Sequence, residues 1–121
     1  MTASPPEYSG LPTAVYTLPE LACVGLMESE ARDAGYDVAV VQKLNACEHF
    51  NAYRMQARAY AYKTIVDKES GKLLGAHLLS PRASEVINVF ALTIRAGLPA
   101  KTLKDVPWAY PTWGSDISGM V

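Results

Sequence analysis

The sequence lacks the features that mark membrane proteins, secreted proteins and nucleic-acid-binding proteins. It has no run of about 18 uninterrupted apolar residues and no basic N-terminal segment followed by an apolar stretch. Its 11 basic and 12 acidic residues give a net charge of -1, so no basic footprint for nucleic acid or an anionic membrane is present. These absences exclude both as partners, and they predict a cytoplasmic protein.

Cysteine and histidine are also scarce. Cys23 and Cys47 are the only cysteines, and their separation matches no redox or zinc motif. We interpret them as buried free thiols, with a disulfide or a reactive thiol as the alternatives. His49 and His77 are the only histidines, and neither has a second ligand spaced nearby, so no metal site is predicted.

The 121 residues fit one domain, and half of them are apolar, which is enough for a core. Residues 1–13 combine three prolines with small polar residues and show no periodicity, so they are predicted to be a linker or disordered leader. The domain is expected to occupy residues 14–121.

Short strands and helices alternate along the domain. Extended, β-prone segments are predicted at Ala14–Thr17, Ala22–Gly25, Asp37–Leu44, Ala57–Asp67 and Leu73–Leu79. The last two are joined by a polar turn and form a hairpin. Helical segments are predicted at Glu28–Ala34, at a 12- to 13-residue helix capped by Ser84, and at Lys101–Asp105, whereas Asn45–Tyr53 is predicted to be irregular. The order favours an α+β fold, with an antiparallel β-sheet and helices packed on one face.

Four segments in sequence order carry a family resemblance. Residues 17–31 follow the pattern T-x-P-E-x-A-x-V-G-x-x-E-x-E-A. Residues 63–77 contain a G-x-L-L-G-A-H run after a strand that carries Lys63, Ile65, Val66 and Asp67. Residues 81–87 resemble a P-x-A-x-E-x-I helix start, and Pro111 and Thr112 form part of a terminal P-T motif. Together they resemble the C-terminal dimerisation domain of the pyridine nucleotide-disulfide oxidoreductases, such as glutathione reductase, dihydrolipoamide dehydrogenase and mercuric reductase.

The resemblance implies a homodimer interface domain that is not catalytic alone. It also implies that upstream domains of a longer parent chain bind FAD and NAD(P). The sequence contains no G-x-G-x-x-G loop and no paired-cysteine redox motif, so we expect this chain alone to bind no cofactor.

The resemblance also identifies a candidate site at Tyr110 and Pro111, which are expected to lie near the flavin of the partner subunit. In the family a catalytic His precedes the P-T motif, and a Glu five residues later orients it. Here Tyr110 occupies the His position and Ser115 the Glu position, while Asp116 is displaced by one residue, or about 100° on a helix. A tyrosine with its ordinary pKa of about 10 is a poorer base than histidine at neutral pH.

Two alternatives remain open. Tyr110 can instead be an interface aromatic, grouped with Trp108 and Trp113, because large rings with one polar group are favoured at interfaces. The whole chain can instead be a free-standing α+β domain that binds a partner or ligand and has lost the enzyme function.

Overall fold

The computed structural model describes residues 10–121, and the first nine residues of the predicted linker lie outside this part. Within it, the strands are β1 (Thr13–Val15), β2 (Glu20–Gly25), β3 (Val38–Lys43), β4 (Ala61–Asp67) and β5 (Leu73–Ser80). The helices are α1 (Glu28–Asp33), α2 (Phe50–Arg54), α3 (Ala83–Arg95) and α4 (Lys101–Asp105), followed by the 3-10 helix η1 (Gly114–Gly119).

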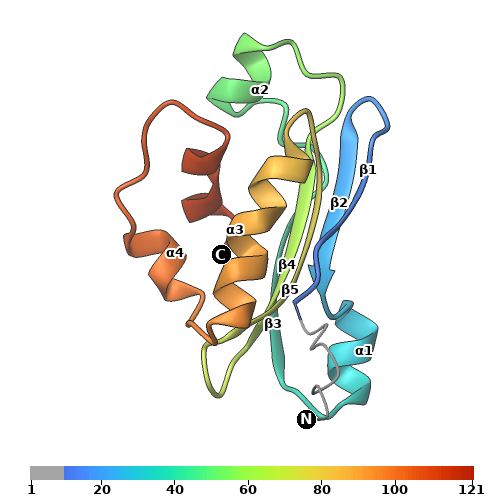
Figure 1. Cartoon of the computed structure of the whole chain (residues 1–121), viewed down its shortest axis with the longest axis vertical. Helices are drawn as coiled ribbons and strands as arrows, with labels where there is room; N and C mark the ends of the chain where they lie inside the picture. The colour runs from blue at the N-terminus through green and yellow to red at the C-terminus, as the bar shows by residue number, and fades with distance from the viewer. Residues whose placement is uncertain (1–9) are drawn as a thin grey trace, which may run out of the picture.

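The strands form one antiparallel sheet in the order β1-β2-β5-β4-β3 (Figure 1). β4 and β5 form the predicted hairpin at its centre, and β2 returns beside β5. The α+β class and the antiparallel sheet are therefore confirmed.

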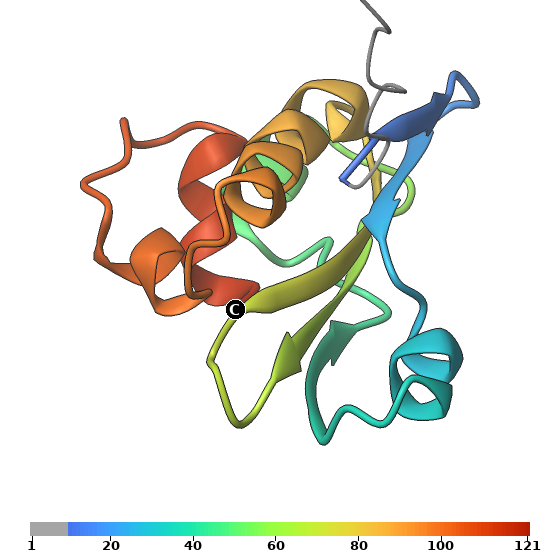
Figure 2. The same cartoon turned by 60° about the horizontal axis from the view of Figure 1, so that its bottom comes forward.

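The main core lies between the sheet and α3. Alternate side chains of the central strands face this helix, because successive residues of a strand point to opposite faces. The buried side chains on the strands include Ala22, Val24, Tyr62, Ala76 and Leu78, and those on α3 include Val86, Ile87 and Phe90. Fully burying a valine, leucine, isoleucine or phenylalanine side chain contributes about 1.5–3 kcal/mol. Figures 1 and 2 show α3 and α4 on the same side of the sheet.

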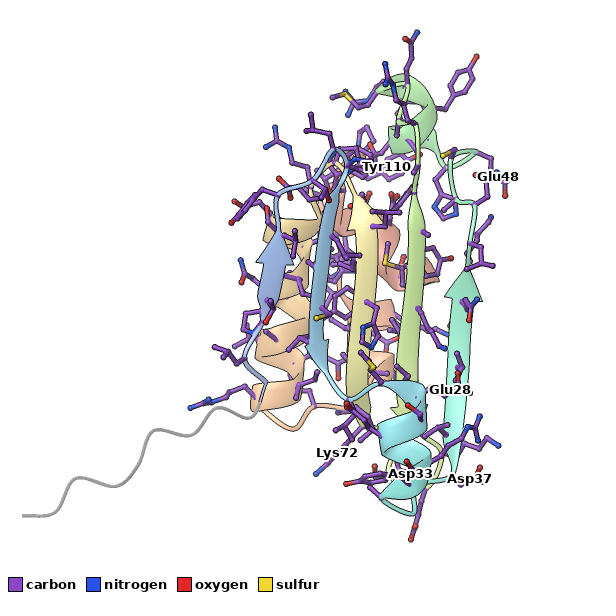
Figure 3. The ribbon with its side chains drawn as sticks, turned by 90° about the vertical axis from the view of Figure 1, so that its right-hand side faces the viewer. Glu28, Asp33, Asp37, Glu48, Lys72 and Tyr110 are labelled. Carbon is purple, nitrogen blue, oxygen red and sulfur yellow. The ribbon has the colours of Figure 1, made fainter. Side chains whose placement is uncertain are left out.

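The helix α1 lies on the opposite face, at one end of the sheet (Figures 2 and 3). Its buried Ala31 packs with Val38 of β3 and Ile65 of β4 in a second, smaller core. Elsewhere on this face the side chains are more exposed, and Leu21 keeps 49% of its surface accessible. The helices α3 and α4 thus lie on one face of the sheet, and the six-residue helix α1 covers only one end of the other face.

Most predicted elements are present within one or two residues. The long helix has 13 residues, α4 has its predicted bounds, and Gly35 follows α1 with a φ of +91°, as expected of a glycine that ends a helix. The local patterns were sufficient here because each element is bounded by its own turn residues.

The strand predicted over Ala57–Asp67 begins only at Ala61, so its first four residues were assigned wrongly. The neighbouring strands supply the reason: β4 pairs with Leu79 of β5 at Ala61 and with Lys43 of β3 at Tyr62, and neither pairing continues to residues 57–60. The carbonyl of Tyr60 instead accepts a hydrogen bond from the backbone N–H of Ala46, at 2.7 Å.

The prediction that Ser84 caps the long helix is also wrong. Arg82 occupies the N-cap position and makes no side-chain cap hydrogen bond. The backbone N–H of Ser84 donates instead to the Glu20 carboxylate, at 2.8 Å, so a residue of β2 supplies the missing cap. Such a cap joins residues that are distant in the sequence and leaves no local pattern.

The prediction that Asn45–Tyr53 is irregular is wrong for its last four residues, which belong to the five-residue helix α2. His49 precedes the helix without a side-chain cap, and five residues are too few for an apolar periodicity. None of the helices within residues 10–121 is long and apolar enough to cross a membrane.

Candidate functional site

Tyr110 lies on the segment between α4 and η1, and 75% of its surface is exposed. Its ring is 6.4 Å from the ring of Phe50 at the start of α2, with an angle of 30° between the planes. Figure 3 shows Tyr110 at one end of the sheet and Glu28 of α1 toward the other. The candidate residue is thus presented to solvent beside a second exposed aromatic side chain.

The segment after Tyr110 forms a tight turn held by its own hydroxyl groups. Thr112 donates its side-chain hydroxyl to the carbonyl of Ala109 at 2.6 Å and its backbone N–H to Ser115 Oγ at 3.1 Å. Ser115 donates its backbone N–H to Thr112 Oγ1 at 3.0 Å and its hydroxyl to the Thr112 carbonyl at 2.7 Å. Ser115, at the position that the resemblance gives to Glu, therefore braces the turn. Pro111, the other candidate residue, is exposed at the start of this turn.

Asp116 forms its hydrogen bonds with residues other than Tyr110. Tyr60, immediately before β4, donates its phenol to Asp116 Oδ2 at 2.7 Å, and Asn51 of α2 donates its side-chain amide to Oδ1 at 3.3 Å. Both carboxylate oxygens thus accept hydrogen bonds from residues far away in the sequence. Asp116 anchors the C-terminal segment and does not orient Tyr110.

Tyr60 is almost entirely buried, with 2% of its surface exposed. Its burial, together with the hydrogen bond to the Asp116 carboxylate, raises the pKa of the phenol far above its ordinary value. The Tyr60 phenol therefore stays protonated, and able to donate its hydrogen bond to Asp116, over a wide pH range.

Asn51 makes the second link between α2 and the C-terminal segment. It has 1% of its surface exposed, and its amide donates to the carbonyl of Thr112 at 2.6 Å as well as to Asp116. Sequence reasoning missed Asn51, because the residue lay in a stretch predicted to be irregular. Nothing local to Asn51 or Tyr60 in the sequence indicates a partner 56 to 65 positions away.

The two tryptophans near Tyr110 pack inward. Trp108 donates its indole N–H to the Leu103 carbonyl at 2.9 Å, and both tryptophans pack partly buried against the main core. The Trp113 ring lies 5.5 Å from that of Tyr60 in an edge-to-face arrangement at 80°. Of the three aromatics grouped in the sequence, Tyr110 is therefore the one that is largely exposed.

The contacts of the cysteines and histidines involve residues other than Tyr110. Cys23 and Cys47 are free thiols of intermediate exposure, so the expectation that they are buried is wrong. His77 Nε2 is 3.2 Å from the carbonyl of Leu26, and the His49 ring packs edge-on against Tyr60 at 5.7 Å. Among residues 10–121, no three His, Cys, Asp or Glu side chains come together in a way that could hold a metal ion.

A separate groove of about 520 Å³ lies beside α1 and is lined partly by Met27, Glu28, Lys63 and His77. The Glu28 carboxylate forms ion pairs with Lys63 at 2.7 Å and with Arg32 at 2.8 Å. These hydrogen bonds, first that from Lys63 and then that from Arg32, lower the pKa of the Glu28 carboxyl. Both cationic side chains that line the groove are therefore bound to the Glu28 carboxylate.

Comparison with known proteins gives one consistent result. Residues 11–120 match the family described as "Pyridine nucleotide-disulphide oxidoreductase, dimerisation domain". The chain is 42% identical over 115 residues to an uncharacterized 19.7 kDa protein in a mercuric resistance operon of Staphylococcus aureus, a match that covers 95% of this chain and 63% of that protein.

Two enzymes are also similar to the chain. Dihydrolipoyl dehydrogenase of Geobacillus stearothermophilus is 33% identical over 108 residues, covering 89% of this chain and 23% of the enzyme. The structure of the flavoprotein disulfide reductase RclA from Escherichia coli, solved as a Cu(II) complex, superimposes with a TM-score of 0.87 at 31% identity, covering 93% of this chain and 25% of RclA. The chain thus spans about a quarter of the length of these enzymes.

Proposed function

Since the chain belongs to the dimerisation-domain family of the pyridine nucleotide-disulphide oxidoreductases, we propose that it pairs with its own copy and presents Tyr110 to the partner subunit's active site. The observation that carries the proposal is the state of Tyr110. Its side chain is 75% exposed, while the backbone on its C-terminal side is held by α2 and by the residue before β4, through Asn51, Asp116 and Tyr60. An exposed side chain on an anchored segment is suited to contact a group outside the domain.

The parent protein in this proposal is an FAD-dependent NAD(P)H oxidoreductase. The relatives that span the domain and more are dihydrolipoyl dehydrogenases and a flavoprotein disulfide reductase, and this chain corresponds to about a quarter of them. In the proposal the other three quarters bind FAD and NAD(P), while Tyr110 and Pro111 approach the flavin bound by the partner subunit. The flavin would supply the electron transfer.

The part played by Tyr110 is that of a hydrogen-bond donor. Its exposed hydroxyl is able to donate to an acceptor on the partner. Asp116 is held by Tyr60 and Asn51, and Ser115 by the turn, so neither of them is placed to orient Tyr110 as a base. The proposal therefore differs from the His–Glu arrangement of the family.

Two experiments test these steps. Sedimentation equilibrium of the chain is expected to show a dimer, and a monomer at high concentration would contradict pairing through this domain alone. In the complete flavoprotein, Tyr110→Ala is expected to lower turnover and to shift the visible flavin absorbance. Tyr53→Ala, which removes another exposed tyrosine from the same end of the domain, is the matched control and is expected to change neither. Unchanged turnover and flavin absorbance in Tyr110→Ala would refute the proposed role of Tyr110.

A second candidate function is a free-standing domain that binds a partner and performs no chemistry. The Staphylococcus aureus relative supports it, because a domain of this kind makes up 63% of a 19.7 kDa protein. The length of the natural reading frame separates the two candidates. A frame that encodes a glycine-rich dinucleotide loop upstream of this domain supports the flavoprotein, and a short frame without one supports the free-standing domain.

A further inference from the structure

Asn51 connects α2 to the turn that carries Tyr110. It is buried, with 1% of its surface exposed, and each of its polar side-chain atoms has a partner. The amide nitrogen donates to the Thr112 carbonyl at 2.6 Å and to Asp116 Oδ1 at 3.3 Å, while Oδ1 accepts from Arg54 Nη2 at 3.4 Å. A buried amide satisfied in this way fixes the relative positions of the groups that it joins.

The two bonds donated by Asn51 hold both ends of the turn. The Thr112 carbonyl lies two residues after Tyr110, and Asp116 follows the turn and is held from the other side by Tyr60. The neighbour of Asn51, Phe50, brings its ring to 6.4 Å from that of Tyr110. Consecutive residues of α2 therefore contact the backbone of the turn and the ring of Tyr110.

This arrangement matters because Tyr110 is mostly surrounded by solvent. An exposed side chain on a mobile loop loses conformational freedom when it engages a partner, and that loss weakens the contact. A site is effective when its residues are held in position by a supporting layer of packing and hydrogen bonds. In this domain the supporting layer comes from α2.

We infer that Asn51 is a positioning residue for Tyr110: its side-chain amide fixes the 110–116 turn and so determines where the Tyr110 hydroxyl is presented. The inference rests on the proposed function insofar as it concerns activity. It also makes a structural statement about this chain, which holds or fails whether or not Tyr110 reaches a flavin.

The structural statement is tested on the chain itself by nuclear magnetic resonance. In the unmodified chain we expect nuclear Overhauser contacts between the Phe50 and Tyr110 rings and slow amide exchange at Ser115, whose N–H is bonded within the turn. In Asn51→Ala the ring contacts are expected to disappear and exchange at Ser115 to quicken by about tenfold or more, while the strand amides keep their shifts. Asn88→Ala is the matched control, since Asn88 also donates to a backbone carbonyl but is exposed on α3.

Ring contacts that persist in Asn51→Ala would overturn the inference, and so would their absence from the unmodified chain. The second measurement needs no variant, so the inference stays testable if Asn51→Ala fails to fold. Asn51→Asp keeps the size and the acceptor oxygen but removes the amide donor, and the same loss of ring contacts is expected from it.

The functional statement is tested in the complete flavoprotein by a double-mutant cycle. Asn51→Ala is expected to lower kcat/KM by about 10- to 100-fold, as small displacements of a reacting group do. In a Tyr110→Ala background the same substitution should have less than about a threefold effect, because a general loss of stability would lower both backgrounds equally. Equal losses in the two backgrounds would overturn a positioning role. If Tyr110→Ala alone has no effect on kcat/KM, the proposed function fails, whereas the resonance measurements still decide whether Asn51 fixes the turn.

Discussion

Gly25 of β2 is paired with Gly75 of β5. At each glycine, the backbone of the neighbouring segment leaves no room for a side chain. A Cβ at Gly25 would be 2.2 Å from the Leu74 carbonyl oxygen, and a Cβ at Gly75 would be 2.0 Å from that of Leu26. The backbone N–H of Leu26 also donates to the Leu74 carbonyl at 2.9 Å, so the chain segments cannot separate without losing this bond.

Gly75→Ala is therefore expected to destabilise the domain by about 3 kcal/mol or more, since overpacking against a backbone cannot be relieved by a side-chain rotation. Urea unfolding followed by circular dichroism measures the loss. Gly119→Ala is the control, because a Cβ there meets nothing within 4 Å. Equal midpoints for the two variants would contradict the steric argument.

The same glycine pair explains why the sequence identified the fold so well. Gly25 and Gly75 belong to two of the segments on which the family resemblance rested, and both are required by the approach of β2 to β5. The hairpin and the long helix were predictable for a similar reason, because the residues that form and end them lie within them.

The support of the candidate site was not predictable in this way. The sequence indicated Tyr110 through its position before a P-T motif, and its catalytic role stays a prediction. Asn51 and Tyr60 reach the C-terminal segment from 56 to 65 residues away, and α2 is too short to leave a periodic pattern. Which polar groups meet across such distances is decided by packing, and no local spacing encodes it.

The cap of α3 by Glu20 gives a prediction of its own. Glu20→Ala is expected to cost about 0.5–2 kcal/mol, the usual cost of removing a helix cap, because the N–H of Ser84 loses its acceptor. Glu20→Gln keeps an acceptor oxygen and loses only the favourable charge at the helix N-terminus, so its cost should be about 0.3–1 kcal/mol. Urea unfolding at pH 7 measures both, with Glu69→Gln on the exposed turn as the control.

The contribution of Glu20 should also depend on pH. The hydrogen bonds from the Ser84 side chain and backbone lower the pKa of its carboxyl. A group with a lowered pKa stabilises the folded state above its unfolded pKa of about 4.3, and the stabilisation is lost as the pH falls through the folded value. The difference in unfolding free energy between the unmodified domain and Glu20→Gln should therefore shrink between pH 5 and the acid limit. A constant difference over that range would show that the charge of Glu20 does not support α3.

Removing the Tyr60 hydroxyl should weaken the attachment of the C-terminal segment at neutral pH and make the domain less sensitive to alkali. Tyr60→Phe leaves Asp116 Oδ2 without its donor, which is expected to cost about 1–3 kcal/mol. Burial and the bond to Asp116 raise the pKa of Tyr60, so its stabilisation is complete below the unfolded value of about 10 and is lost as the pH rises above it. The stability gap between the unmodified domain and Tyr60→Phe should therefore narrow from pH 9 to pH 11.

Tyr62→Phe provides the comparison for that experiment, because Tyr62 of β4 is also buried and its hydroxyl donates to the Gly119 carbonyl at the longer distance of 3.4 Å. A bond of this length is weak, so Tyr62→Phe is expected to cost less at pH 7 than Tyr60→Phe. The urea midpoints of the three proteins at pH 7, 9 and 10.5 measure both effects. A gap for Tyr60→Phe that stays constant to pH 10.5, or a larger cost for Tyr62→Phe, would mean that the Tyr60–Asp116 bond does not make the expected contribution to holding the C-terminal segment.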